Sequence, residues 1–121
     1  MACVAVATFG AGLFAGCAPA PEIDREQLAQ QVKAEFLHAW NGYRQYAWGH
    51  DALLPLSNGF RDWHDQSLLM TPLDAFDTMM LMGLDEEAAD AKALILEQLS
   101  FDHDFSVQVF EIVIRTLGGL I

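Results

Sequence analysis

The sequence has few cysteines and few basic residues. Among its 121 residues there are two cysteines, Cys3 and Cys17. The chain after Cys17 therefore offers neither a disulfide framework nor a thiolate metal site. Lys and Arg together number 6 against 17 Asp and Glu, which gives a net charge of −11. Because such a chain repels phosphates, nucleic acid is excluded as an expected partner. At this length the chain forms one domain at most.

Charge is also absent from the first 21 residues, which are mostly small or apolar. This stretch is short for a membrane span and unlike a soluble core, so residues 1–17 are interpreted as a secretory signal. The run LFAGC resembles a bacterial lipobox, which makes Cys17 the expected lipidation site. We expect an exported protein, periplasmic or anchored in the membrane only through this lipid, with residues 18–23 as a tether. No Lys or Arg precedes the run, which leaves a simple cleaved signal or a misassigned start open.

The first predicted helix begins at Asp24, which stands three residues before Gln27 in capping-box spacing. Apolar residues then recur every three or four positions, as on one helix face. They are Leu28, Val32, Phe36, Trp40, Tyr43 and Ala47. We expect Gly49 to end this helix. Residues 49–70, with Asn58-Gly59 and several polar side chains, are expected to form a loop.

Two further helices are predicted to form an antiparallel hairpin. Thr71 is the expected cap of the first, with Pro72 at its first helical position and Gly83 as its stop. The second begins at Asp85, where three acidic residues suit the helix dipole, and runs to Leu99. Because only a couple of residues separate them, the two helices should pack side by side.

From Ser106 onward the pattern is ambiguous between a strand and a helix. The run VQVFEIVIR is rich in β-branched residues and alternates in part. Gln108, Glu111 and Arg115 are nevertheless spaced three and four residues apart, which lines one side of a helix. We therefore expect a helix that Gly118-Gly119 closes or bends. The predicted fold class is all-α, and four such apolar helices resemble the beginning of a larger all-α domain.

Two acidic spots are candidates for chemistry. Glu111 and Arg115 are set among apolar neighbours, so they form either a solvated ion pair or a buried carboxyl that acts as acid, base or ligand. Asp74 is best explained as a cap in the first turn of its helix. Asp77 lies past that turn, where capping explains it less well, and it is a candidate for lining a polar pocket. Trp40 is expected in the core rather than in sugar stacking.

The four histidines show no metal-ligand spacing. We therefore expect His38, His50, His64 and His103 to make hydrogen bonds at the surface or in loops.

Three blocks of the sequence, FLHAWNGYRQYAWGHDALLPLS, TPLDAFDTMMLMGL and VQVFEIVIRTLGGL, resemble class I α-1,2-mannosidases, glycoside hydrolase family 47. The resemblance implies an (α/α)7 barrel, of which residues 24–121 would be the N-terminal part with about two helix hairpins. It also implies a monomer that hydrolyses α-1,2-linked mannose from oligosaccharides or glycoproteins with inversion. A calcium ion that contacts the sugar is implied too, with ligands outside this chain.

The same resemblance implies roles for three residues. Glu111 matches the acid that assists the leaving group, Arg115 a substrate contact and, less closely, Asp77 an acidic pocket residue. Inversion needs a second carboxyl about 6.5–9.5 Å away, which is expected outside this chain. The chain by itself should then be inactive, poorly stable and prone to associate through apolar faces.

Some alternatives remain open at this point. An apolar wall favours a protonated Glu111, whereas Arg115 favours an ionised one. The competing functions are a non-catalytic mannose-binding relative and a helical structural lipoprotein without a sugar site.

Overall fold

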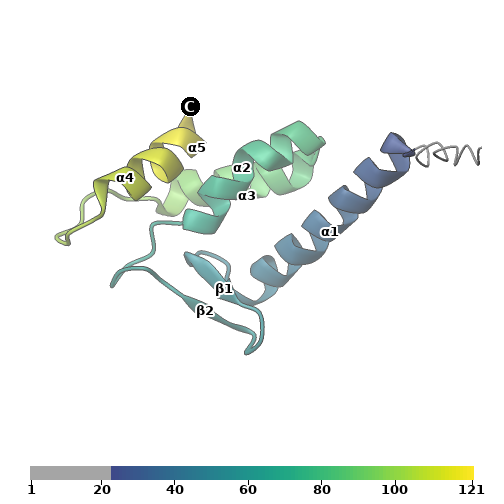
Figure 1. Ribbon diagram of the computed structural model, residues 1–121. Helices are drawn as coiled ribbons and strands as arrows, with labels where there is room; N and C mark the ends of the chain where they lie inside the picture. The colour runs from purple at the N-terminus through teal and green to yellow at the C-terminus, as the bar shows by residue number, and fades with distance from the viewer. Residues whose placement is uncertain (1–22) are drawn as a thin grey trace, which may run out of the picture.

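The computed structural model describes residues 23–121 (Figure 1). Its elements are α1 (Arg25–Tyr46), β1 (Ala52–Leu54), β2 (Gly59–Arg61), α2 (Met70–Met82), α3 (Asp85–Gln98), α4 (Val109–Ile112), the π-helical η1 (Val113–Leu117) and α5 (Gly118–Leu120). The predicted signal, the lipidation site Cys17 and the tether up to residue 22 lie outside the described residues. Within residues 23–121, no helix has both the length and the apolar character needed to cross a membrane.

Helix α1 begins as predicted and ends slightly earlier. The Asp24 carboxylate accepts the Gln27 backbone N–H at 3.0 Å, and Ala47 rather than Gly49 caps the C-terminal end. The predicted apolar face is buried at Trp40, Tyr43 and Ala47 but half exposed toward the N-terminus, at Leu28 and Val32 for example. In Figure 1 the N-terminal end of α1 extends beyond the turn between α2 and α3.

The segment after α1 is not the plain loop that was expected. Strands β1 and β2 form an antiparallel hairpin that pairs Ala52 with Arg61 and Leu54 with Gly59. Ser57 N donates to Leu54 O at 3.2 Å, and Asn58 adopts a left-handed conformation with φ of 53°. Asparagine tolerates this region better than most residues, so Asn58-Gly59 was a hairpin signal that the loop prediction passed over.

Helices α2 and α3 form the predicted antiparallel hairpin. Gly83 ends α2 in the left-handed conformation, with φ of 64°, as predicted. The predicted N-terminal cap is wrong, since α2 begins at Met70 and Thr71 lies inside it. The Thr71 hydroxyl instead donates to the Asp51 carbonyl at 2.6 Å. The Asp51 carboxylate accepts the Met70 N–H at 3.1 Å, so the helix start is capped from a distant segment.

Two clusters of buried side chains hold these elements together. The first joins the end of α1 to α2 and α3, and the second joins the start of α2 to the end of α3. The first contains Trp40, Tyr43, Ala47, Met79, Leu84, Ala88 and Ala91, and the second Leu69, Leu73, Leu94 and Ile95. Trp40 and Tyr43 stack with ring centroids 5.2 Å apart. The prediction that Trp40 belongs to the core is therefore confirmed.

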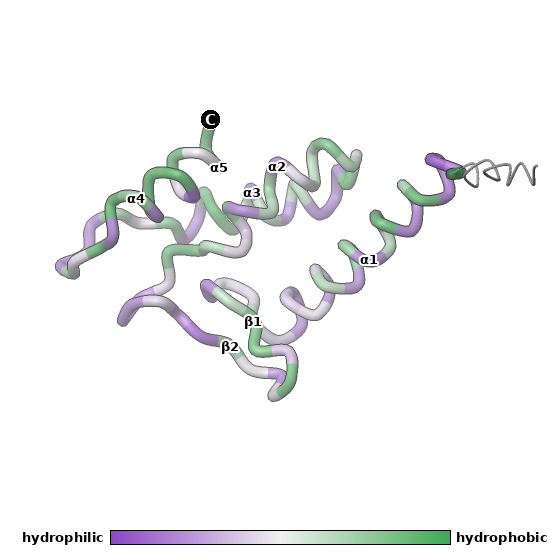
Figure 2. Tube along the Cα trace, viewed as in Figure 1, coloured by the Kyte–Doolittle hydropathy of each residue, from purple (hydrophilic) through white to green (hydrophobic). Residues whose placement is uncertain are grey.

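The C-terminal segment is helical, as its polar spacing predicted. Helices α4, η1 and α5 follow one another without a break, and the glycine pair continues the helix instead of closing it. A Cβ on Gly119 would lie 2.7 Å from the Leu73 carbonyl oxygen, so this glycine permits close packing of α5 on α2. The apolar residues of this segment are largely exposed, and Figure 2 shows it mostly green.

Candidate functional site

Arg115 lies between two carboxylates that come from different helices. Its Nε donates to Glu111 Oε2 at 2.9 Å, and its Nη1 donates to Asp74 Oδ2 of α2. The hydrogen bond with Glu111, followed by that with Asp74, raises the pKa of the Arg115 guanidinium above its ordinary value. The cluster is therefore a fixed cation shared by two anions.

The local structure explains how these groups meet. Glu111 and Arg115 are four residues apart, so one helical turn brings their side chains together. Arg115 belongs to the π-helical η1, and such segments are frequent at functional sites. The close approach of α5 to α2 at Gly119 brings the C-terminal segment onto α2, which carries Asp74. The ion pair therefore depends on tertiary packing as well as on the helix itself.

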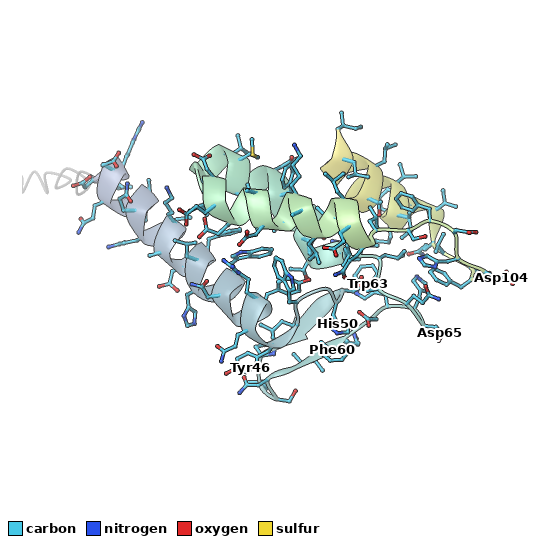
Figure 3. The ribbon with its side chains drawn as sticks, turned by 180° about the vertical axis from the view of Figure 1, so that it is seen from behind. Tyr46, His50, Phe60, Trp63, Asp65 and Asp104 are labelled. Carbon is cyan, nitrogen blue, oxygen red and sulfur yellow. The ribbon has the colours of Figure 1, made fainter. Side chains whose placement is uncertain are left out.

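An aromatic ring completes the surroundings of Arg115. The guanidinium carbon lies 5.2 Å from the ring centroid of Trp63, within the range of a cation–π interaction. Trp63 follows β2 and comes from the side of the molecule that also carries His50 and Phe60 (Figure 3). Arg115 is thus contacted by three separate segments of the chain.

An open pocket of about 370 Å³ lies beside this cluster. The segment at and after β2 lines it on one side, and α4 with the residue before it lines the other. The lining residues are Arg61, Asp62, Trp63, His64, Gln108, Glu111 and Ile112. Glu111 therefore lies at a pocket whose other lining residues are charged, polar, aromatic and aliphatic.

Of the two alternatives for Glu111, the described residues show the ion pair with Arg115 and not a carboxyl buried among apolar side chains. The Glu111 side chain is 32% exposed, and the neighbouring Val109 and Phe110 are 71% and 68% exposed. The physical reason is the orientation of the helix. Glu111 and Arg115 face α2 and the segment after β2, while much of the broad apolar surface faces outward.

The structure gives Asp74 a role other than the predicted cap and shows Asp77 exposed. Because α2 begins at Met70, Asp74 lies beyond the first turn and pairs with Arg115 instead of capping the helix. Asp77 is exposed on α2, and it is neither a member of the Arg115 cluster nor a lining residue of the pocket.

His50, His64 and His103 lie in loops and turns, whereas His38 is exposed on α1. His50 Nδ1 lies 2.9 Å from Asp62 Oδ2, and its ring stacks on Phe60, so the hydrogen-bonding interpretation is confirmed for His50. His64 stacks on Phe105. Within residues 23–121, no three His, Cys, Asp or Glu side chains lie close enough to hold a metal ion. The described residues therefore do not fit a complete calcium site, and none of them is assigned a role with calcium.

Comparison with known proteins identifies the family of the chain. The model of glycosyl hydrolase family 47 matches residues 35–121. The endoplasmic reticulum mannosyl-oligosaccharide 1,2-alpha-mannosidase of Homo sapiens is 48% identical over 86 residues, which is 71% of this chain and 12% of the relative. The Rattus norvegicus protein of the same name is 44% identical over 103 residues, 85% of this chain and 15% of the relative.

A solved structure agrees as well. The alpha-1,2-mannosidase from Trichoderma reesei is 35% identical and superposes with a TM-score of 0.70, covering 78% of this chain and 20% of that one. It is an (α/α)7 barrel, so the described helices form part of that fold, and the fold prediction is confirmed. The chain spans only about a seventh of the length of the curated relatives named above. It belongs to glycosyl hydrolase family 47.

Proposed function

We propose that the complete product of this gene hydrolyses α-1,2-linked mannose in oligosaccharides or glycoproteins. The observation that carries the proposal is the position of Glu111, which lines the pocket while its carboxylate is hydrogen-bonded to Arg115. The relatives at 44% and 48% identity are named mannosyl-oligosaccharide 1,2-alpha-mannosidases, which supports the same substrate class.

In this mechanism Glu111 donates a proton to the glycosidic oxygen as the bond breaks, and Arg115 contacts the substrate. A proton donor must be protonated at that step. Asp74 shares the guanidinium charge, which reduces the attraction between Arg115 and Glu111. The reaction we propose is inverting, so a second carboxyl activates water on the opposite face of the sugar. That second carboxyl is not assigned to any described residue.

Other parts of the proposal rest on the sequence. Asp77 is proposed as a pocket residue, although it is exposed in the described part of the chain. A calcium ion with ligands outside residues 23–121 would bind hydroxyl groups of the sugar. We also propose a monomeric, exported protein, periplasmic or anchored through a lipid on Cys17.

A second candidate function is mannose binding without hydrolysis. The ion pair between Glu111 and Arg115 favours it, since an ionised carboxylate accepts hydrogen bonds from sugar hydroxyls but has no proton to donate. The two functions differ in one outcome, which is whether bound mannoside is cleaved.

The experiment is to incubate the complete gene product with α-1,2-linked mannobiose and measure the mannose released. Glu111→Gln should lower kcat about 10²–10⁴-fold, the usual contribution of general acid catalysis. Calorimetry should show that this variant still binds the disaccharide. Glu35→Gln is the matched control, because it makes the same change on an exposed part of α1. Binding with no release in the wild type would favour the second function, and neither binding nor release would contradict both.

A further inference from the structure

Asp51 and the Asp62–Trp63 segment are joined by reciprocal hydrogen bonds. The Asp51 backbone N–H donates to Asp62 Oδ1 at 2.9 Å, and the Trp63 backbone N–H donates to Asp51 Oδ2 at 2.9 Å. Asp62 is held further by the contact of its Oδ2 with His50 Nδ1. The backbone that carries Trp63 is therefore fixed on both sides of the peptide bond.

The second oxygen of the Asp51 carboxylate has a different set of donors. Its Oδ1 accepts the Ser67 hydroxyl at 3.1 Å, the Leu68 N–H at 2.7 Å and the Met70 N–H at 3.1 Å. Asp51 is 1% exposed, and these bonds to three backbone amides and one hydroxyl stabilise its buried carboxylate. One carboxylate thus connects the segment of Trp63 to the start of α2, the helix that carries Asp74.

The side chains of Trp63 and Asp74 both contact the guanidinium of Arg115. The indole lies against the guanidinium at 5.2 Å, and the Asp74 carboxylate accepts one of its N–H groups. We propose that Asp51 and Trp63 are positioning residues, which hold Arg115 in the orientation that pairs it with Glu111 at the pocket. This inference rests on the proposed function of the site, because it gives a task to the orientation of Arg115.

The guanidinium of Arg115 is carried by a long side chain with many rotamers. Trp63 is 39% exposed and Arg115 36% exposed, so solvent alone would leave the guanidinium several rotamers. A ring beside a planar cation selects the orientations in which the two can stack. A ring of this kind keeps its place only if its backbone is fixed, which is what the buried Asp51 carboxylate provides.

The test uses the complete gene product with three substitutions. Trp63→Ala removes the ring, while Trp63→Phe retains an aromatic face. Asp51→Asn is the sharper change. With the amide oxygen in the place of Oδ1, the three hydrogen bonds to that oxygen are kept. The NH₂ group then faces the Trp63 N–H, and two donors cannot form a hydrogen bond. Trp48→Ala is the matched control, because Trp48 makes the same kind of contact with Arg44, at 5.8 Å, away from the pocket.

Two readouts separate positioning from a loss of folded protein. The first is the NMR resonance of the Arg115 Nε–H, identified by its disappearance in Arg115→Lys and sensitive to the nearby ring. It should move in Asp51→Asn, which retains the ring, and stay unchanged in Trp48→Ala. The second is KM for the disaccharide, which should rise about twofold to thirtyfold in Trp63→Ala, the range of cation–π interactions. Trp63→Phe should restore most of this loss. A loss of folded protein alone would lower apparent kcat at constant KM.

The outcomes distinguish this inference from the proposed function. If the wild type releases no mannose, the proposed function fails, and the Arg115 resonance in Asp51→Asn alone decides whether Asp51, through Trp63, holds the guanidinium. If the wild type is active but KM is unchanged in Trp63→Ala, the inference is overturned while the proposed function stands. If Asp51→Asn does not fold, the role of Trp63 is still decided by its two variants. If Asp51→Asn folds with the wild-type resonance, Asp51 has no positioning role.

Discussion

Arg115 in η1 and Asp74 in α2, 41 residues apart in the sequence, form a hydrogen-bonded ion pair. The pair connects the helix that carries Glu111 to the helix hairpin at the centre of the described structure. Because the same guanidinium also binds Glu111, the geometry of the pocket is coupled to the packing between α2 and the C-terminal helix.

The Asp74–Arg115 pair should contribute modestly to stability. Both side chains are more than one third exposed, and exposed pairs are worth about 0.2–1 kcal/mol. Asp74→Asn should lower the free energy of unfolding by that amount in dilute buffer. High salt should reduce the difference, because it screens exposed charges. Urea titrations at low and high salt measure this, with the exposed Asp77→Asn as control. An equal salt-dependent loss in both variants would contradict the pairing.

The two neighbouring glycines of the C-terminal helix should respond in opposite ways to alanine. A Cβ at residue 119 would meet the Leu73 carbonyl oxygen at 2.7 Å, whereas a Cβ at Gly118 would meet nothing within 4 Å. Gly119→Ala should therefore destabilise the protein by about 1–3 kcal/mol through displaced packing. Gly118→Ala should be neutral or stabilise it by up to about 1 kcal/mol, because alanine favours helix. The urea midpoints of the two variants measure the contrast, and equal shifts would refute the close contact of α5 with α2.

Tyr43 should make the protein less stable at alkaline pH. Burial raises the pKa of the Tyr43 phenol above its ordinary value of 10.0. The unfolded chain then loses the phenolic proton at a lower pH than the folded chain. The sign follows from linkage: the contribution is complete below pH 10.0 and is lost as pH rises above it.

The substitution Tyr43→Phe tests this directly. It removes the hydrogen bond to the His50 carbonyl, 2.8 Å long, at a cost of about 0.5–1.5 kcal/mol at neutral pH. It should also flatten the decline of stability above pH 10.0. Tyr46→Phe is the control, because Tyr46 is 38% exposed. Melting temperatures between pH 7 and pH 11 that decline equally in both variants would show that Tyr43 is not the group responsible.

Local periodicity was enough to predict the helices. The Asp24 cap, the stop at Gly83 and the spacing of Gln108, Glu111 and Arg115 depend on residues within a few positions of one another. The contact of Glu111 with Arg115 was predictable for the same reason. The hairpin at Asn58-Gly59 was also local, and it was missed because its strands are only three residues long.

The rest of the site could not be read from local pattern. Asp74 and Trp63 reach Arg115 only because α2, the segment after β2 and η1 pack together. The role of Asp51 depends on donors that lie 12 to 19 residues further along the chain. No periodicity relates such positions. A surface aspartate and a buried aspartate with all its hydrogen bonds made, such as Asp51, therefore cannot be distinguished from the sequence alone.

The most direct test of the central claim compares two substrates in the complete gene product. A glycosidic oxygen needs a proton in order to leave, whereas the fluoride of α-mannosyl fluoride leaves without one. If Glu111 is the proton donor, Glu111→Gln should lower kcat on α-1,2-linked mannobiose about 10²–10⁴-fold and leave hydrolysis of the fluoride close to that of the wild type. An equal loss on both substrates, or no loss on the disaccharide, would contradict the account.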